Sequence, residues 1–111
     1  MADPDQALNP GSILQALGDP TRRQIVEVLG RGPLTVSALA APFEMSLTAI
    51  VQHLRVLEEC GLVATEKVGR VRTCQLRMDG LDALTQWIEQ RRPEWHRRLG
   101  RLADLLGEEV R

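Results

Sequence analysis

Three polar side chains in the middle of the chain share one face of a predicted helix. Ser46 can cap the start of this helix and Gly61 can end it. At about 100° per residue, Thr48, Gln52 and Arg55 fall opposite the isoleucine and leucines that face the core. Glutamine can pair with adenine, arginine with guanine, and a threonine methyl can touch thymine. This face therefore suits the reading of DNA bases, with an ordinary solvated helix face as the alternative.

A basic hairpin is predicted directly after this helix. Val63–Val68 and Val71–Leu76 have the composition of short strands, and Gly69 lies at a turn between them. Three basic side chains decorate the hairpin: Lys67, Arg70 and Arg72. Such a hairpin is suited to straddle a phosphate backbone or to enter a minor groove. The alternative is that these charges only make the hairpin soluble.

Two further helix starts and a tight turn are predicted before the helix that begins at Ser46. Asp19-Pro20 is a strong helix start, and Thr35 can cap a short helix that ends near Pro42. A short helix, a turn and a second helix form a helix-turn-helix, whose second helix enters the major groove. We therefore expect DNA contacts from Ser46, Thr48, Ala49, Gln52, His53, Arg55, Lys67, Arg70 and Arg72. His53 lies beside the core face, so a packed histidine is an equal alternative for it.

Composition and charge limit the function classes. A chain of 111 residues suggests one domain, and its net charge of −1 hides an uneven distribution. Residues 20–77 carry eight basic and five acidic side chains, so the basic excess coincides with the predicted DNA-reading segment. No apolar run approaches the roughly 18 residues of a membrane span, and the N-terminus lacks the pattern of a secretory signal. We therefore expect a cytoplasmic protein with no membrane partner.

Reactive groups are few and scattered. Neither His53 nor His96 has a catalytic partner at a usable spacing, and no glycine loop suited to phosphate binding is present, so we predict no enzymatic activity and no cofactor. Cys60 and Cys74 lack the spacing of a redox or metal motif and are expected to be free thiols. The alternative is that these cysteines form a thiol switch that moves the hairpin when they are oxidised.

Apolar side chains at both ends of the chain predict self-association. Residues 1–11 are expected to form a flexible arm, and residues 12–111 a domain that begins with a helix capped by Ser12. Asp79 should cap a long amphipathic helical region, which Pro93 kinks or restarts. Its apolar stripe is too large for a small domain to hide alone. The expected dimer interface consists of Ile13, Leu14, Leu17, Trp87, Trp95, Leu99, Leu102 and Leu106.

Several sequence blocks together resemble the ArsR/SmtB family of small bacterial winged-helix repressors. The blocks are LGDPTRRQIVEVL, LTVSALAAPF, SLTAIVQHLRVLEECGLV and VGRVRTCQL. The resemblance implies a mainly α fold with a small β-hairpin, that is, a dimeric winged helix-turn-helix. It also implies an obligate dimer through the first and last helices, and repression that an effector relieves. We therefore predict a sequence-specific DNA-binding repressor that binds a palindromic operator as a homodimer.

The chain departs from the metal-sensing members of this family. Where they carry a Leu-Cys-Val-Cys pattern, this chain has Leu34-Thr35-Val36-Ser37, and hydroxyls are poor ligands for soft metals. A second family site uses Asp and His pairs on the last helix, but Asp79, Asp82, His96 and Asp104 lack that spacing. We therefore predict no metal site, a place in a metal-independent branch and a small-molecule or protein effector. A winged helix used for protein docking, and a regulator that responds to oxidation of Cys60 or Cys74, remain as alternatives.

Overall fold

The computed structural model describes residues 8–107, which begin with two short helices, α2 (Pro10–Leu17) and α3 (Pro20–Leu29). The side chain of Asn9 caps α2 by accepting hydrogen bonds from the backbone N–H groups of Gly11 and Ser12. The prediction that Ser12 caps this helix was therefore wrong, because Asn9 supplies the oxygen and Pro10 fits the first turn. Residues 1–7 of the predicted arm (residues 1–11) lie outside the described residues, whereas Pro10 and Gly11 belong to α2 and not to an arm.

The helix-turn-helix follows as a two-residue strand and two helices. These are β1 (Leu34–Thr35), α4 (Val36–Ala40) and α5 (Leu47–Glu59). Thr35 and Ser46 accept a hydrogen bond from a backbone N–H in the first turn of α4 and α5, respectively, at 3.1 Å. Both caps, like the Asp19 cap of α3, were predicted from the residue types.

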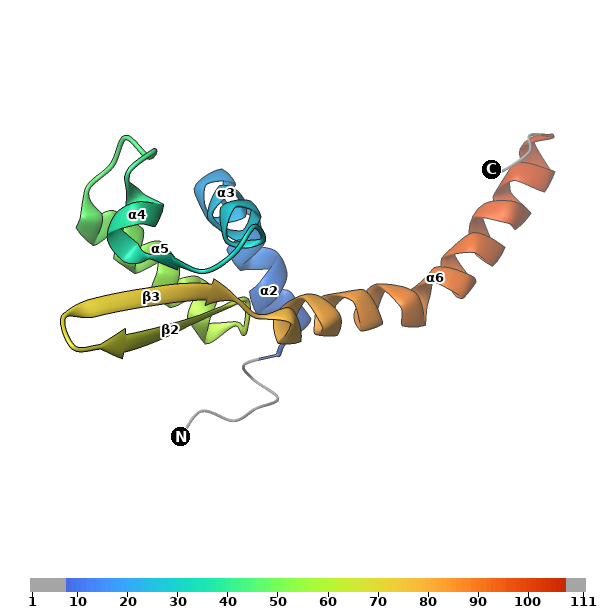
Figure 1. Ribbon diagram of the computed structural model, residues 1–111. Coiled ribbons are helices and arrows are strands. Elements are labelled where there is room, and N and C mark those ends of the chain that lie inside the picture. Colours follow the sequence, from blue (N-terminus) through green and yellow to red (C-terminus); the bar gives the residue numbers. More distant parts are fainter. Residues whose placement is uncertain (1–7, 108–111) are drawn as a thin grey trace.

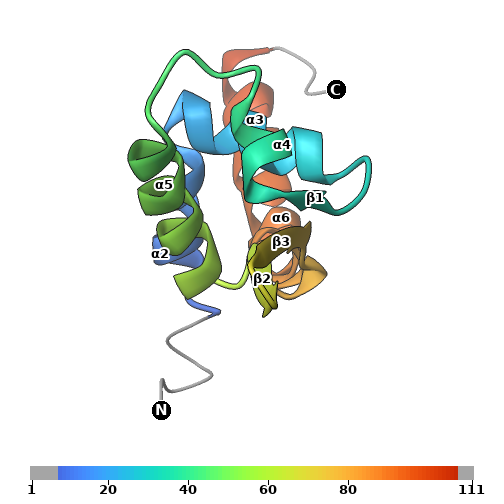
Figure 2. The ribbon, with the colours of Figure 1, turned by 60° about the vertical axis from the view of Figure 1, so that its left-hand side comes forward.

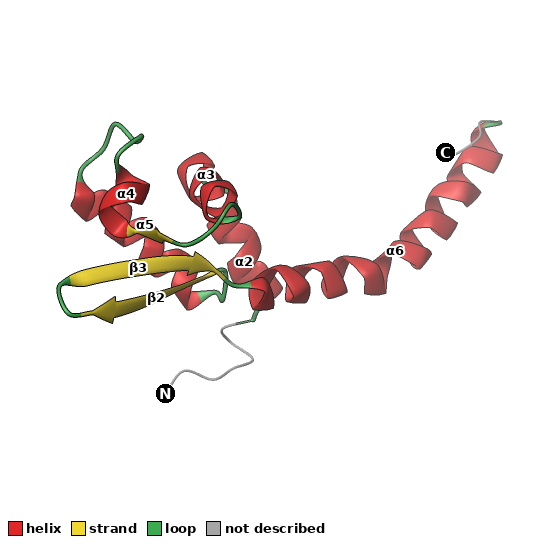
Figure 3. Cartoon of the chain, viewed as in Figure 1, coloured by secondary structure: helices red, strands yellow, loops and turns green. Residues whose placement is uncertain are grey.

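Two longer strands complete an antiparallel sheet in the order β1-β3-β2. The strands β2 (Val63–Val68) and β3 (Val71–Leu76) have the predicted bounds, and Gly69 adopts a left-handed φ of 63° at the turn between them. The strand β1 was not predicted, because two residues are too few to show an alternating pattern. Figure 3 shows this small sheet beside a mainly helical chain, which confirms the predicted fold class of a winged helix-turn-helix.

The chain ends in one long helix, α6 (Met78–Leu106), that leaves the rest of the fold. The residue before α6 is Arg77, and Asp79 lies inside the first turn, where it pairs with Arg77. Asp79 is therefore not the cap that the sequence suggested. Pro93 lies within α6 and does not restart it, and the helix bends in its middle part in Figure 1. A proline removes one backbone hydrogen bond and crowds the preceding turn, which favours such a bend.

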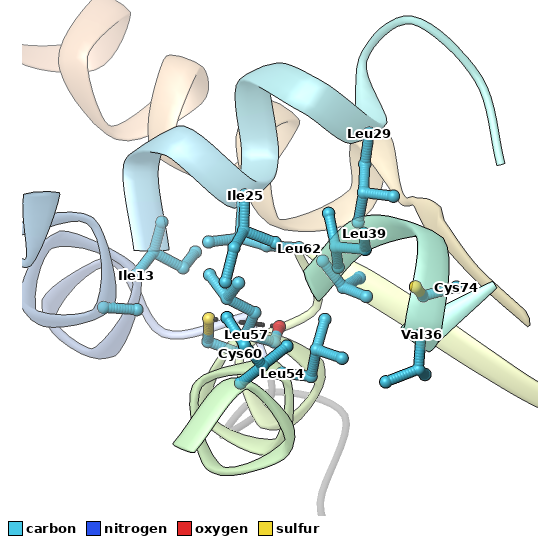
Figure 4. Close-up of a cluster of buried hydrophobic side chains, with 13 residues drawn as sticks. Ile13, Ile25, Leu29, Val36, Leu39, Leu54, Leu57, Cys60, Leu62 and Cys74 are labelled. Carbon is cyan, nitrogen blue, oxygen red and sulfur yellow. Dashed lines mark hydrogen bonds between the residues drawn. The ribbon is translucent and has the colours of Figure 1, made fainter. Parts of the chain in front are cut away.

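The hydrophobic core lies where α2, α3, α4 and α5 meet the base of the hairpin. Figure 4 shows its side chains converging from these elements, with Ile13 and Ile25 pointing inward from α2 and α3. Figure 2, turned toward the hairpin end, shows α6 behind the other elements. The molecule is elongated, with extents of 63 × 33 × 21 Å, because the far half of α6 leaves this core.

None of the helices within residues 8–107 is both long enough and apolar enough to cross a bilayer.

Candidate nucleic-acid interface

The helix α5 has the two faces that its sequence predicts. Ile50, Leu54 and Leu57 are at most 3% exposed and belong to the core. Thr48, Gln52 and Arg55 are exposed, and so is Ser46 at the cap. Ala49 is partly buried, with its backbone N–H bonded to the Ser46 hydroxyl oxygen. The Ser46 hydroxyl therefore keeps its own proton available for a phosphate oxygen.

The hairpin carries its three predicted cations on exposed positions. Lys67 and Arg72 are directly paired across the two strands, so both side chains project from the same face of the sheet. Like charges at such a distance repel each other, and a nearby anion would relieve the repulsion. Val68 and Val71 at the tip are 69% and 51% exposed, so the cations surround a small apolar tip.

Hydrogen bonds fix the hairpin relative to α5. The Thr65 hydroxyl in β2 lies 3.1 Å from each carboxylate oxygen of Glu58 in α5, to which it donates. The backbone N–H of Leu62 donates to the carbonyl of Leu57 at 2.9 Å and closes the turn between the two elements. Gly61 occupies this turn with a left-handed φ of 79°. The helix α5 and the hairpin are therefore held as one unit.

A hollow of about 410 Å³ lies between α4, the first half of α5 and the tip of the hairpin, and sequence reasoning missed it. Its walls include Ser37, Leu47, Val51, Arg70, Val71 and Arg72. Leu47 is 53% exposed at the start of α5, although it is apolar. A single exposed leucine is common on protein surfaces, so the sequence carried no clear signal of the hollow, which depends on how α4, α5 and the hairpin pack together.

His53 does not share the fully exposed face of Thr48 and Gln52. It is half-buried, and its Nδ1 lies 3.4 Å from a terminal guanidinium nitrogen of Arg22. The same Arg22 donates from Nε to the carbonyl of Ala16 at 2.7 Å. The sequence could not reveal this contact, because Arg22 and His53 are 31 residues apart.

Both cysteines are buried within the core. The Cys60 thiol donates to the carbonyl of Leu57 at 3.4 Å, and the Cys74 thiol donates to the carbonyl of Leu34 at 3.2 Å. Burial raises the pKa of both thiols above the usual value for cysteine. Figure 4 places Cys60 and Cys74 well apart in the core. These surroundings favour protonated, poorly reactive thiols over a redox switch.

Possible metal ligands are dispersed in the described part of the chain. No group of three or more His, Cys, Asp or Glu side chains lies close enough together to hold an ion within residues 8–107. Thr35 caps α4 and Ser37 lines the hollow beside the hairpin. The predicted absence of a metal site stays a prediction.

The residues predicted for a dimer interface divide into two groups. Ile13 is 0% exposed in the core of its own chain, so it has no surface left for a second copy. The others keep surface, from the partly buried Leu17 and Trp87 to the well-exposed Leu14, Trp95, Leu99, Leu102 and Leu106. Trp87 and Trp95 meet edge to face with ring centroids 5.9 Å apart, and the Arg91 guanidinium lies 4.4 Å from the Trp87 ring.

The fold and the exposed polar helix define a winged helix-turn-helix protein, and comparisons with known proteins give its family. Residues 19–65 match the family model described as bacterial regulatory protein, arsR family. The chain is 41% identical to the HTH-type transcriptional regulator Rv2034 of Mycobacterium tuberculosis, over 91% of this chain and 92% of that protein. The chain belongs to the ArsR family.

Two further comparisons agree with this assignment. The chain is 27% identical to the transcriptional repressor SdpR of Bacillus subtilis, over 69% of this chain and 86% of that protein. The structure matches an ArsR-like transcriptional regulator from Rhodococcus sp. RHA1 with a TM-score of 0.74 and 35% identity. That match covers 91% of this chain and 94% of the other. The protein is thus a DNA-binding transcriptional regulator and not an enzyme.

Proposed function

We propose that this regulator is a repressor that binds a palindromic operator as a homodimer. The observation that carries the proposal is the arrangement of α5, whose polar side chains are exposed on the face opposite its buried apolar side chains. The hairpin adds three exposed cations beside this face. We assign base contacts to Thr48, Gln52 and Arg55, and phosphate contacts to Ser46, Lys67, Arg70 and Arg72. Because its partner is DNA, we place the protein in the cytoplasm.

The shape of the single chain supports the homodimer. Its radius of gyration is 18.2 Å, compared with about 13 Å for a compact chain of this length. The excess comes from α6, which exposes a ladder of large apolar side chains over its outer half: Trp95, Leu99, Leu102, Leu105 and Leu106. A second copy would cover this ladder. A two-fold dimer would place two α5 helices about 34 Å apart, on successive major grooves of a palindrome.

We propose an effector that is not a metal ion. The support is the chemistry of the residues at the position where metal-sensing relatives carry cysteines, since Thr35 and Ser37 offer hydroxyls and no thiolate. The buried, protonated thiols of Cys60 and Cys74 argue against an oxidant as the signal.

A titration on DNA from just upstream of the gene tests the proposal. The protein is titrated on this duplex and on a scrambled duplex at two salt concentrations. We expect a preference of roughly a thousandfold or more for the upstream duplex. Equal, weak and salt-sensitive binding to both duplexes would contradict specific regulation at that site. The winged helix would then be examined as a protein-docking surface by a pull-down.

A further inference from the structure

Arg22 in the first turn of α3 joins two other helices. Its Nε donates to the carbonyl of Ala16 at 2.7 Å, and one terminal nitrogen lies 3.3 Å from the carbonyl of Gln15. Both carbonyls lie in the last turn of α2, where the negative end of the helix dipole favours a cation. The other terminal nitrogen reaches Nδ1 of His53 in α5 at 3.4 Å. One guanidinium therefore contacts the end of α2 and the reading helix together.

The direction of the Arg22–His53 hydrogen bond is fixed by chemistry. A guanidinium has donors and no acceptor, so Nδ1 of His53 must accept and the ring proton must lie on Nε2. His53 directly follows Gln52, so the contact is adjacent to a side chain proposed to read bases. His53 is half-buried, which limits the movement of its ring.

The carboxylate of Asp19 holds the backbone of Arg22 in place. Its carboxylate accepts the backbone N–H of Arg22 at 3.1 Å and that of Thr21 at 2.8 Å. The Arg22 backbone is therefore anchored at the cap of α3 while its side chain extends toward α2 and α5.

We propose that Arg22 is a positioning residue for DNA recognition, which acts by fixing α5 against the end of α2 through His53. The proposal rests on the proposed function, because it assigns to His53 and Arg22 an effect on operator binding without contact with DNA. It also connects α5 to the helix that carries Leu14, a member of the proposed dimer surface.

Arg23 provides a matched control. It is the next residue in α3, carries the same charge, and donates to the carbonyl of Leu17 at 2.6 Å. This hydrogen bond ends at α2 and does not extend to α5. An effect of helix capping alone would therefore appear in both arginine variants, whereas positioning of α5 would appear only at Arg22.

A double-mutant cycle on operator affinity tests the coupling. We expect Arg22→Met and His53→Leu each to weaken operator binding roughly tenfold, as befits the loss of a hydrogen bond to a charged group. The double variant should lose no more operator affinity than either single variant. Arg22→Lys should bind the operator more tightly than Arg22→Met, and Arg23→Met should bind it about as tightly as the parent. The salt slope should stay unchanged in all variants. Additive losses, or a slope reduced by about one, would overturn the proposal in favour of independent or direct phosphate contacts.

A measurement without DNA separates this proposal from the proposed function. Nitrogen-15 spectra of the His53 ring, recorded where histidine is neutral, should show an accepting Nδ1 and a protonated Nε2 in the parent and in Arg23→Met. In Arg22→Met the Nδ1 resonance should move toward that of an imidazole nitrogen that accepts no hydrogen bond, while Nε2 keeps its proton. An unchanged His53 spectrum in Arg22→Met would overturn the inference even if the operator is bound. Absence of operator preference in the parent, with the His53 pattern intact, would count against the proposed function alone. If Arg22→Met fails to fold, the same comparison is made with Arg22→Ala and Arg23→Ala, and an unchanged Nδ1 resonance in Arg22→Ala would again overturn the inference.

Discussion

Single residues on α5 and on the hairpin are expected to contribute to DNA binding in different ways. Gln52→Ala should reduce the preference for the operator by roughly tenfold or more, because an amide that reads a base edge is worth about 1–3 kcal/mol. Its affinity for unrelated DNA should hardly change. The measurement is a pair of titrations on operator and scrambled duplexes.

Arg70→Ala should weaken binding to every duplex and lower the salt slope by about one, since a phosphate contact carries no sequence information. Gln52→Ala serves as its control and should leave the salt slope unchanged. If both variants changed affinity equally on all sequences, the assignment of the reading face would be wrong.

The buried cysteines allow a test that needs no DNA. Because burial raises the pKa of the Cys60 and Cys74 thiols, few thiolates are present near neutral pH. We expect both to react with a thiol reagent at least ten times more slowly in the native protein than after unfolding. Fast native reaction of either thiol would restore the redox alternative, which a Cys60→Ser, Cys74→Ser double variant would then examine under peroxide.

Burial on α5 could be predicted at the residue scale because a helix repeats about every 3.6 residues. Ile50, Leu54 and Leu57 recur with that period and are all buried. The same rule placed His53 at the edge of the core and left its role open. Its contact with Arg22 depends on the packing of α3 against α5, which no local pattern encodes.

At the scale of elements, the junction between α5 and α6 depends on a close approach of two backbones. The N–H of Gly80 donates to the carbonyl of Gly61 at 2.9 Å, and a Cβ on Gly80 would lie 2.8 Å from the carbonyl oxygen of Cys60. Gly80→Ala should therefore destabilise the fold by about 1–3 kcal/mol, because backbone atoms cannot easily yield. Thermal or urea unfolding measures this change.

Gly100→Ala is the matched control on the same helix. No atom lies within 4 Å of a Cβ built at Gly100, and alanine favours a helix over glycine by about 0.5–1 kcal/mol. We expect this variant to be as stable as the parent or more stable. If both alanine variants behaved alike, the close approach at Gly80 would not explain the effect.

The Asp19 cap predicts a dependence of stability on pH. Hydrogen bonds from the backbone N–H groups of Arg22 and Thr21 lower the pKa of Asp19 below its usual value. Its contribution to stability is therefore present above the unfolded pKa and is lost as the pH falls through the folded pKa. Asp19→Asn should keep a capping oxygen but remove this part of the acid dependence, as unfolding curves at neutral and acidic pH would show. An unchanged acid dependence would contradict this role.

The regular elements were largely predictable, and the irregular ones were not. Alternating β-branched residues around Gly69 gave β2 and β3 their predicted bounds. The strand β1 exists only because Leu34 and Thr35 pair with Cys74 and Thr73 far along the chain. At Pro93 the sequence left a kink and a restart open, and the structure shows one continuous helix with a bend, since the flanking turns retain their own helical hydrogen bonds when one is removed.

At the scale of the whole molecule, formation of the proposed homodimer should depend on the apolar ladder of α6. Leu99 is 52% exposed in the single chain, and we propose that the dimer covers it. Leu99→Asp would place a charge in this covered surface. We expect light scattering to show a shift from dimer to monomer at micromolar protein, with operator affinity reduced at least tenfold. Gln90→Asp, an exposed polar position on the same helix, should leave both unchanged. A parent protein that is monomeric at micromolar concentration would contradict the dimer.

The separation of the two faces of α5 affects how such regulators can evolve. Thr48, Gln52 and Arg55 are exposed, and the folded chain is built around the opposite face. Substitutions at these three positions should therefore be nearly neutral for stability, within about 0.5 kcal/mol, while they change the preferred base pairs. After gene duplication, a daughter protein could thus acquire a new set of target genes through a few mutations and retain an intact scaffold throughout.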